Sequence, residues 1–143
     1  HLVSHLERAG MKVDTVVDLQ PTSPLRRPED VEAALQLLGD ADLVVSVTEP
    51  SHNPYYTLAE ADAQGLLQLS KPARFARRQD APVLWALTGP FSVGGAAALP
   101  QAIAEGFWSV RSRPYAMPRR RSVDIDDLED FELAQWYLQR SDT

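Results

Sequence analysis

The sequence contains no cysteine among its 143 residues, so neither a disulfide framework nor a thiolate metal site is available. No apolar run approaches the roughly 20 residues that a membrane-spanning helix needs, and the first residues lack a signal-peptide pattern. The three histidines do not have metal-ligand spacing, and there is no phosphate-binding glycine loop, cysteine nucleophile or Ser/His/Asp arrangement. These absences predict a cytoplasmic protein that does not contact a membrane.

Basic residues are the minority, with 14 Lys and Arg against 20 Asp and Glu, which gives a net charge of −6. That balance argues against a surface that wraps nucleic acid, and the scattered tyrosines and tryptophans do not form a stacking platform. Hydrophobic residues make up 44% of the chain, enough to form a core. We therefore predict one globular domain over residues 1–143, with no nucleic-acid partner.

The clearest pattern is a strand, a helix and a second strand joined by short links. Residues 13–19 are rich in valine, and residues 43–48 form a buried β-branched run. Between them, Pro28 begins a helix that Gly39 ends. Its apolar face is predicted to contain Val31, Ala34, Leu35 and Leu38. This βαβ unit predicts parallel strands, a right-handed crossover and an α/β fold.

Other elements are shorter. Residues 1–9 resemble the end of a helix closed by Gly10, and short strands are expected at 55–58 and 65–69. Strands at 83–87 and 91–93 flank Thr88-Gly89-Pro90, and a short alanine-rich helix follows at 96–104. The last helix is expected to start at Asp126, three residues before Glu129, as an aspartate version of a capping box.

The first candidate site is the loop Leu19-Gln-Pro-Thr-Ser-Pro-Leu-Arg26, which follows the first strand. Two prolines stiffen its backbone. They leave an amide, two hydroxyls and a guanidinium available, those of Gln20, Thr22, Ser23 and Arg26. The carboxyl end of a parallel strand is where α/β sheets bind ligands. The alternative is a proline-stiffened turn with solvated polar residues.

The second candidate is Arg121-Ser-Val-Asp-Ile-Asp126. Its alternation predicts an extended segment with Val123 and Ile125 inward and the carboxylates of Asp124 and Asp126 on the other face, about 7 Å apart. Two such acids suit Mg²⁺, which prefers carboxylate oxygens and bridges protein to phosphate. The alternative is that Asp126 caps the following helix while Asp124 is solvated. The two roles are compatible, because a carboxylate has two oxygens.

The third candidate is an arginine-rich loop in which Arg74, Arg77, Arg78 and Gln79 could bind the carboxylate of an acidic sugar. A solvated charged loop is the alternative. His52 lies in a loop after a strand, where it could contact a ligand or simply be exposed.

Four strings in matching order resemble the N-acylneuraminate cytidylyltransferases, the CMP-sialic acid synthetases. They are LQPTSPLR at 19–26, PEDVEAA at 28–34, SVTEPSHNPYY at 46–56 and PYAMPRRRSVDIDDLEDFELA at 114–134. The resemblance implies a Rossmann-like, three-layer nucleotidyltransferase fold with a mainly parallel central sheet. It also implies transfer of CMP from CTP to an acidic nine-carbon sugar, with Mg²⁺ as cofactor and pyrophosphate released, in a homodimer.

The resemblance also implies roles for particular residues. Asp124 and Asp126 would be catalytic and hold the metal against the α-phosphate, and Gln20 would contact the acceptor sugar. Thr22, Ser23 and Arg26 would shape the loop around that sugar. Arg77, Arg78 and Gln79 would lie near the sugar carboxylate, in a region that often reaches a neighbouring subunit in this family.

The sequence departs from the family pattern in two places. Relatives begin with a strand and a glycine- and lysine-bearing loop that grips the triphosphate, which this sequence lacks, so only the C-terminal two-thirds of the family domain is expected. Relatives also have an Asn-Gly-Ala turn where this chain has Thr88-Gly89-Pro90. Two alternatives therefore stay open: a truncated, non-catalytic relative for sugar binding or subunit contacts, and a cytidylyltransferase for 3-deoxy-manno-octulosonate.

Overall fold

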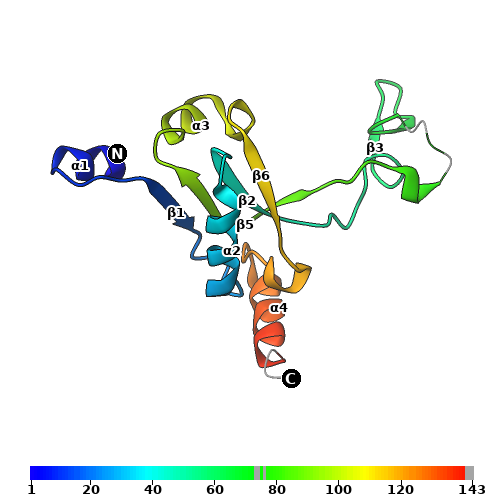
Figure 1. Cartoon of the computed structure of the whole chain (residues 1–143). Helices are drawn as coiled ribbons and strands as arrows, with labels where there is room; N and C mark the ends of the chain where they lie inside the picture. Colours follow the sequence, from blue (N-terminus) through cyan, green and yellow to red (C-terminus); the bar gives the residue numbers. More distant parts are fainter. Residues whose placement is uncertain (73–74, 76, 141–143) are drawn as a thin grey trace. The chain divides into compact units, whose positions relative to one another are not determined.

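The computed structural model describes residues 1–72, 75 and 77–140. Its regular elements, in chain order, are α1 (Leu2–Arg8), β1 (Thr15–Leu19), α2 (Pro28–Leu38), β2 (Leu43–Thr48), β3 (Ala59–Ala61), β4 (Leu67–Leu69), η1 (Arg78–Asp80), β5 (Ala86–Gly95), α3 (Leu99–Glu105), η2 (Phe107–Ser109), β6 (Ser112–Ala116), η3 (Arg119–Arg121) and α4 (Leu128–Gln139). Figure 1 shows them along the chain. No helix in this described part is long and apolar enough to cross a membrane.

The chain divides into two compact units. The first comprises residues His1–Thr48 and Leu87–Thr143, and the second comprises Glu49–Ala86. The second unit contains the antiparallel pair β3–β4, whose turn is closed by Asp62 accepting hydrogen bonds from the backbone N–H of Gln64 and Leu66. A single domain over residues 1–143 stays a prediction.

The first unit is built on a sheet in the order β1-β5-β2-β6. β1 pairs antiparallel with β5, and β2 pairs parallel with β6. The backbone N–H of Gly95 donates to Asp42 beside the start of β2, while Phe91 bonds Ser46 farther along, so β5 also runs opposite to β2. Three strands therefore share one direction. The predicted α/β fold class is confirmed.

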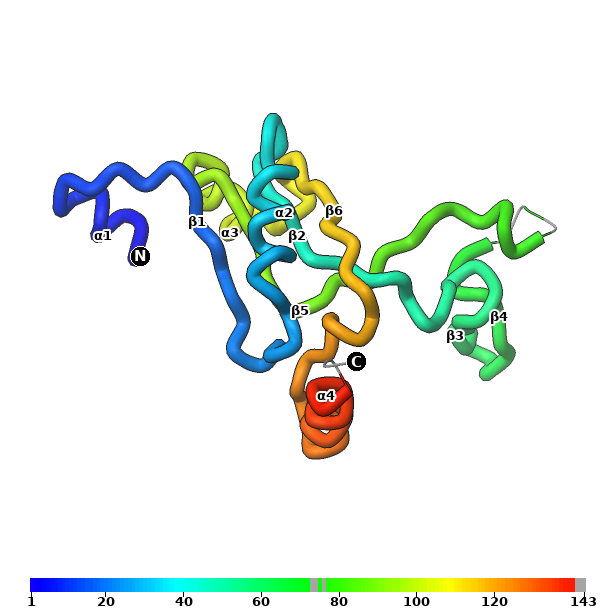
Figure 2. The backbone as a smooth tube through the Cα atoms, turned by 60° about the horizontal axis from the view of Figure 1, so that its bottom comes forward, coloured from blue at the N-terminus to red at the C-terminus, as the bar shows by residue number. Residues whose placement is uncertain are grey.

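Helix α2 covers this sheet, as Figures 1 and 2 show, and contacts β2 and β6. Its buried Ala34 packs with Val44, Phe91, Val93 and Met117 to form the core. Val31 and Leu38 pack against the same cluster, as predicted, but the prediction for Leu35 is wrong, since its side chain is 41% exposed. The buried strand β2 is confirmed.

Strand β5 differs from the two separate strands that the sequence predicted. The expected break at Thr88-Gly89-Pro90 is wrong, because one strand runs through these residues. Pro90 has no N–H and would leave a gap in a central ladder. At the next residue, the hydroxyl of the fully buried Ser46 bonds both backbone groups of Phe91: it accepts from the N–H at 3.2 Å and donates to the carbonyl at 2.8 Å. A side chain thus replaces ladder hydrogen bonds.

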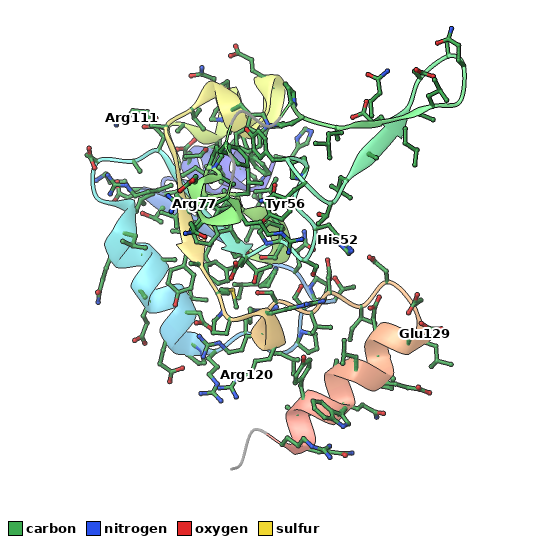
Figure 3. The ribbon with its side chains drawn as sticks, turned by 90° about the vertical axis from the view of Figure 1, so that its right-hand side faces the viewer. His52, Tyr56, Arg77, Arg111, Arg120 and Glu129 are labelled. Carbon is green, nitrogen blue, oxygen red and sulfur yellow. The ribbon has the colours of Figure 1, made fainter. Side chains whose placement is uncertain are left out.

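Strand β6 was not predicted, because its sequence Ser-Arg-Pro-Tyr-Ala has no strong strand pattern. Its start is set by Asp42, whose carboxylate accepts the backbone N–H of Arg111 at 3.0 Å and its Nε at 3.3 Å. Figure 3 labels this arginine. These hydrogen bonds lower the pKa of Asp42. A long-range contact, rather than local propensity, therefore sets this edge of the sheet.

Two smaller predictions also differ from the structure. The strand expected at 55–58 is wrong, because these residues form turns and the first strand of that unit begins at Ala59. The final helix begins at Leu128 and is capped by Asp127, whose carboxylate accepts the backbone N–H of Asp130 at 2.9 Å. Capping by Asp126 is therefore wrong by one residue, since Asp127 has the extended backbone that an N-cap needs.

Candidate functional site

The loop after β1 is held by its own arginine. The Nη1 of Arg26 donates to the backbone carbonyl of Gln20 at 2.5 Å and to that of Ser23 at 2.7 Å. A guanidinium group has several donors and can bond two carbonyls of one tight turn. The loop is therefore fixed by Arg26, whose guanidinium is directed at the loop backbone, while the side chains of Gln20 and Thr22 are exposed.

Asp124 lies against this loop. The hydroxyl of the fully buried Ser23 donates to Asp124 Oδ1 at 3.1 Å. One residue further along, the backbone N–H of Ile125 donates to the carbonyl of Thr22 at 2.9 Å. Two motifs separated by about 100 residues in the sequence are thus joined by a side-chain and a backbone hydrogen bond.

Gly89 completes this contact from the central strand β5. A Cβ atom placed on Gly89 would collide with Asp124 Oδ2 and would lie 2.6 Å from Gln20 Oε1. The next residue, Pro90, accepts the backbone N–H of Gln20 at 3.3 Å, which holds the start of the loop on the strand. Only glycine fits here without moving a neighbour. We call Gln20, Ser23, Gly89 and Asp124 the Asp124 cluster.

A small cavity of about 80 Å³ adjoins the Asp124 cluster. It is lined by Asp18, Gln20, Val45, Thr88, Gly89, Phe91, Ser92 and Phe107. Its wall includes the hydroxyl of Thr88, which is buried and has no hydrogen-bond partner in the described part of the chain. The cavity combines a carboxylate, an amide and hydroxyl groups, a set that can form hydrogen bonds with a polar ligand.

Asp126, the second predicted acid, is exposed, whereas Asp124 is half-buried. Residues 122–125 belong to no helix or strand, and the extended backbone expected there stays a prediction. Asp127 caps α4, so the carboxylate of Asp126 is not used for capping. The backbone N–H of Asp126 donates to the carboxylate of Asp130.

The two acids are chemically suitable for Mg²⁺. Within the residues that the structure describes, no group of three or more His, Cys, Asp and Glu side chains gathers. Mg²⁺ needs no such cage, because it binds one or two carboxylates, several waters and substrate phosphates. Asp124 Oδ1 is held by Ser23, which leaves its Oδ2 without a hydrogen bond among the described contacts. Asp124 and Asp126 could therefore hold the ion.

A buried ion pair supports the segment that carries Asp124. Arg121 Nη2 lies 2.7 Å from Asp30 Oδ1, and the two side chains are 21% and 3% exposed. Tyr115 donates its hydroxyl to the same oxygen at 2.9 Å, and the other oxygen accepts the backbone N–H of Arg27. Burial, followed by the hydrogen bond to Asp30, raises the pKa of Tyr115. This network ties α2 to β6 and to the start of the Asp124 segment.

The remaining predicted residues belong to the second unit. Arg77 forms an ion pair with Asp80, with Nε 3.0 Å from Oδ2, and the guanidinium of Arg78 stacks over the Tyr56 ring at 5.1 Å from its centroid. Figure 3 labels Arg77 and Tyr56. Gln79 is exposed, as is His52, and Arg74 lies outside the described residues.

Arg78 and Gln79 line a cavity of about 520 Å³ in this unit. The same walls include Glu49, Tyr56 and Trp85, which the sequence analysis did not select. Arg78 and Tyr56 are 22 positions apart in the sequence and are brought together only by the fold. No local pattern in the sequence therefore indicated that Tyr56 belongs to this site. The cavity joins aromatic surface to polar groups, as small-molecule sites do.

Sequence comparison finds no family model that matches the chain. The chain is 23% identical over 128 residues to the post-translational flagellin modification protein B of Campylobacter coli, covering 88% of this chain and 53% of that protein. The chain therefore spans about half the length of that curated relative.

Structure comparison finds solved proteins with a similar fold, among them a synthase and a synthetase. One is a 4-diphosphocytidyl-2C-methyl-D-erythritol synthase from Anaerococcus prevotii, with a TM-score of 0.61 and 13% identity over 96% of this chain and 65% of the other. The second is a CMP:2-keto-3-deoxy-manno-octonic acid synthetase complexed with CTP, with a TM-score of 0.55 and 16% identity over 97% and 66%. The chain shares the α/β fold of these nucleotidyltransferases.

Proposed function

We propose that this chain carries the sugar- and metal-facing part of a cytidylyltransferase that transfers CMP from CTP to sialic acid or a related nonulosonic acid and releases pyrophosphate. The observation that carries the proposal is the hydrogen bond from Ser23 to Asp124, which joins the LQPTSPLR and SVDID motifs beside Gly89. The similarity to a flagellin modification protein and the shared fold agree with this class of enzyme.

The loop after β1 has two tasks in this proposal: it orients Asp124 and it presents Gln20 to the sugar. Ser23 orients the Asp124 carboxylate by a hydrogen bond, and Arg26 keeps the loop closed. Gln20 is an exposed residue on this rigid backbone, with its Oε1 beside Gly89, and its amide is proposed to contact the acceptor sugar. Positioning of this kind is a large part of catalysis in phosphoryl-type transfers, where the reacting atoms must approach in line.

The proposed cofactor is Mg²⁺, held by Asp124 and Asp126. When bound, the ion would neutralise charge on the α-phosphate and orient it for attack by the sugar hydroxyl. The two aspartates contribute the anionic oxygens for this task, and Ser23 prevents Asp124 from rotating. The proposal needs no third protein ligand.

Arg77, Arg78 and Gln79 are proposed to bind the carboxylate of the sugar. Guanidinium groups bind carboxylates in a bidentate manner, and Arg78 is held in place by the ring of Tyr56. In a homodimer, which we also propose, these residues would serve the site of a neighbouring subunit. The reaction is proposed to take place in the cytoplasm.

The test is pyrophosphate release from CTP by the whole gene product with Mg²⁺ and a panel of acidic sugars. We expect turnover with a nonulosonic acid and weaker or no turnover with 3-deoxy-manno-octulosonate. Turnover with the latter alone would change the acceptor but keep the chemistry. CTP and Mg²⁺ binding without turnover of any sugar would favour a non-catalytic, sugar-binding or subunit-contact role.

The variant Asp126→Asn tests the metal role directly. We expect it to abolish Mg²⁺-dependent turnover while the fold is retained, because the Asp126 side chain is exposed. Glu129→Gln is the matched control: it removes an acid that is also exposed, three residues along and labelled in Figure 3, which we place outside the site. Unchanged turnover in Asp126→Asn would refute the metal role.

A further inference from the structure

We propose that an arginine-lined cavity on the first unit binds a phosphate-bearing anion. The cavity has a volume of about 140 Å³ and is lined by Pro24, Leu25, Arg26, Arg27, Arg120, Arg121, Tyr137 and Leu138. It is separate from the cavity beside Asp124. The proposal does not depend on the proposed catalytic function, and its test needs no turnover.

The charge of the cavity is the first argument. Four of its eight lining residues are arginines and none is an acid, in a chain whose net charge is −6. This concentration is therefore local rather than part of a generally basic surface. Guanidinium groups held in one place bind phosphate oxygens through paired hydrogen bonds, and a dianion matches several of them better than a single carboxylate does.

The second argument is that, among the residues the structure describes, no acid pairs with two of these arginines. Arg121 is paired with Asp30, and Arg26 is used by the loop carbonyls. Across the described ranges, no carboxylate lies within 4.0 Å of the guanidinium of Arg27 or Arg120. Exposed arginines commonly lack partners, but here both face one hollow that two further arginines line. A bound anion would supply the missing charge.

The cavity lies between two segments of the chain that a bound anion would connect. One wall is the end of the loop that carries Ser23, and another is η3, three residues before Asp124. Figure 3 shows Arg120 near the N-terminal end of α2. An anion bound by Arg27 and Arg120 would connect the two segments that the Ser23–Asp124 hydrogen bond joins, and so would stabilise the folded unit by mass action.

The test is calorimetric titration of the chain with pyrophosphate in EDTA at constant ionic strength. EDTA removes metal-dependent binding at the aspartates. We expect saturable binding of one anion, and a rise in melting temperature with pyrophosphate concentration. Arg120→Gln is expected to weaken the binding at least tenfold. Arg119→Gln removes the same charge from an exposed neighbour that does not line the cavity, and is expected to change Kd less than twofold.

Three further ligands identify the source of the anion. Inorganic phosphate tests a free ion, CMP tests a phosphate carried by a nucleotide, and acetate tests whether any carboxylate suffices. Arg120-dependent binding of phosphate or CMP supports the proposal and assigns the source. Absence of saturable pyrophosphate binding, equal loss in Arg119→Gln and Arg120→Gln, or equally tight binding of acetate would each overturn it.

Discussion

Replacing Asp30 with alanine would remove the acid at the centre of the network that joins α2, β6 and the Asp124 segment. The Asp30 side chain is 3% exposed and lies 2.7 Å from Arg121, whose own side chain is 21% exposed. Without Asp30, the arginine would keep its charge in a largely buried place and Tyr115 would lose its acceptor. Removing one partner of a buried pair costs about 3–5 kcal/mol.

That loss is large for a chain of this size, because folded domains are typically stable by about 5–15 kcal/mol. It corresponds to a fall of about 9–15 °C in melting temperature at roughly 3 °C per kcal/mol. Urea unfolding, followed by circular dichroism, would measure the free energy. The matched control is Glu29→Ala, which removes an exposed acid from the same helical turn and should change stability by less than about 0.5 kcal/mol.

The double variant Asp30→Ala/Arg121→Met separates the ion pair from simple packing loss. It removes the unpaired charge, so it should recover much of the stability that Asp30→Ala loses. A loss below about 1 kcal/mol in Asp30→Ala, or a double variant less stable than the single one, would show that the buried charge is not the cause.

Three other variants test individual contacts. Gly89→Ala should push the side chains of Asp124 and Gln20 aside and lower Mg²⁺-dependent turnover more than stability, because the colliding atoms are the ends of flexible side chains; unchanged turnover would contradict the collision. Ser46→Ala should cost about 1–3 kcal/mol, because it leaves the buried N–H of Phe91 in β5 without its acceptor. Unchanged protection of that N–H in hydrogen exchange would contradict this role of Ser46. Burial and Asp30 raise the pKa of Tyr115 above its ordinary value of 10.0, so the folded state keeps this proton at higher pH than the unfolded chain does. The stability that Tyr115 contributes is therefore present below about pH 10 and falls as pH rises through the folded-state pKa. Tyr115→Phe should reduce that alkaline loss, and an identical pH profile would refute the assignment.

Local signals predicted the elements that depend on nearby residues. Pro28 and Gly39 mark the two ends of α2, and its apolar spacing identified Val31, Ala34 and Leu38 as core residues. Leu35 was assigned wrongly, because helical spacing gives a wide apolar stripe and the sheet covers only part of it.

Elements that depend on distant partners were missed or misplaced. Thr88-Gly89-Pro90 suggested a break, yet β5 continues through it, and the hydroxyl of Ser46, more than 40 residues away, bonds the backbone of Phe91 just beyond it. β6 has little propensity of its own and forms as the parallel neighbour of β2. The burial of Asp30 against Arg121 was not predicted, since its position in the first turn of α2 gives no sign of that contact.

The sequence by itself determined the α/β class, the position of α2 and β2, and the two motifs that contain the candidate residues, because these depend on spacing along the chain. The tertiary structure decided that Ser23 contacts Asp124, that Gly89 leaves room for both Gln20 and Asp124, and that four arginines line one cavity. Such contacts arise from packing between segments that are far apart in the chain, and no local pattern encodes them.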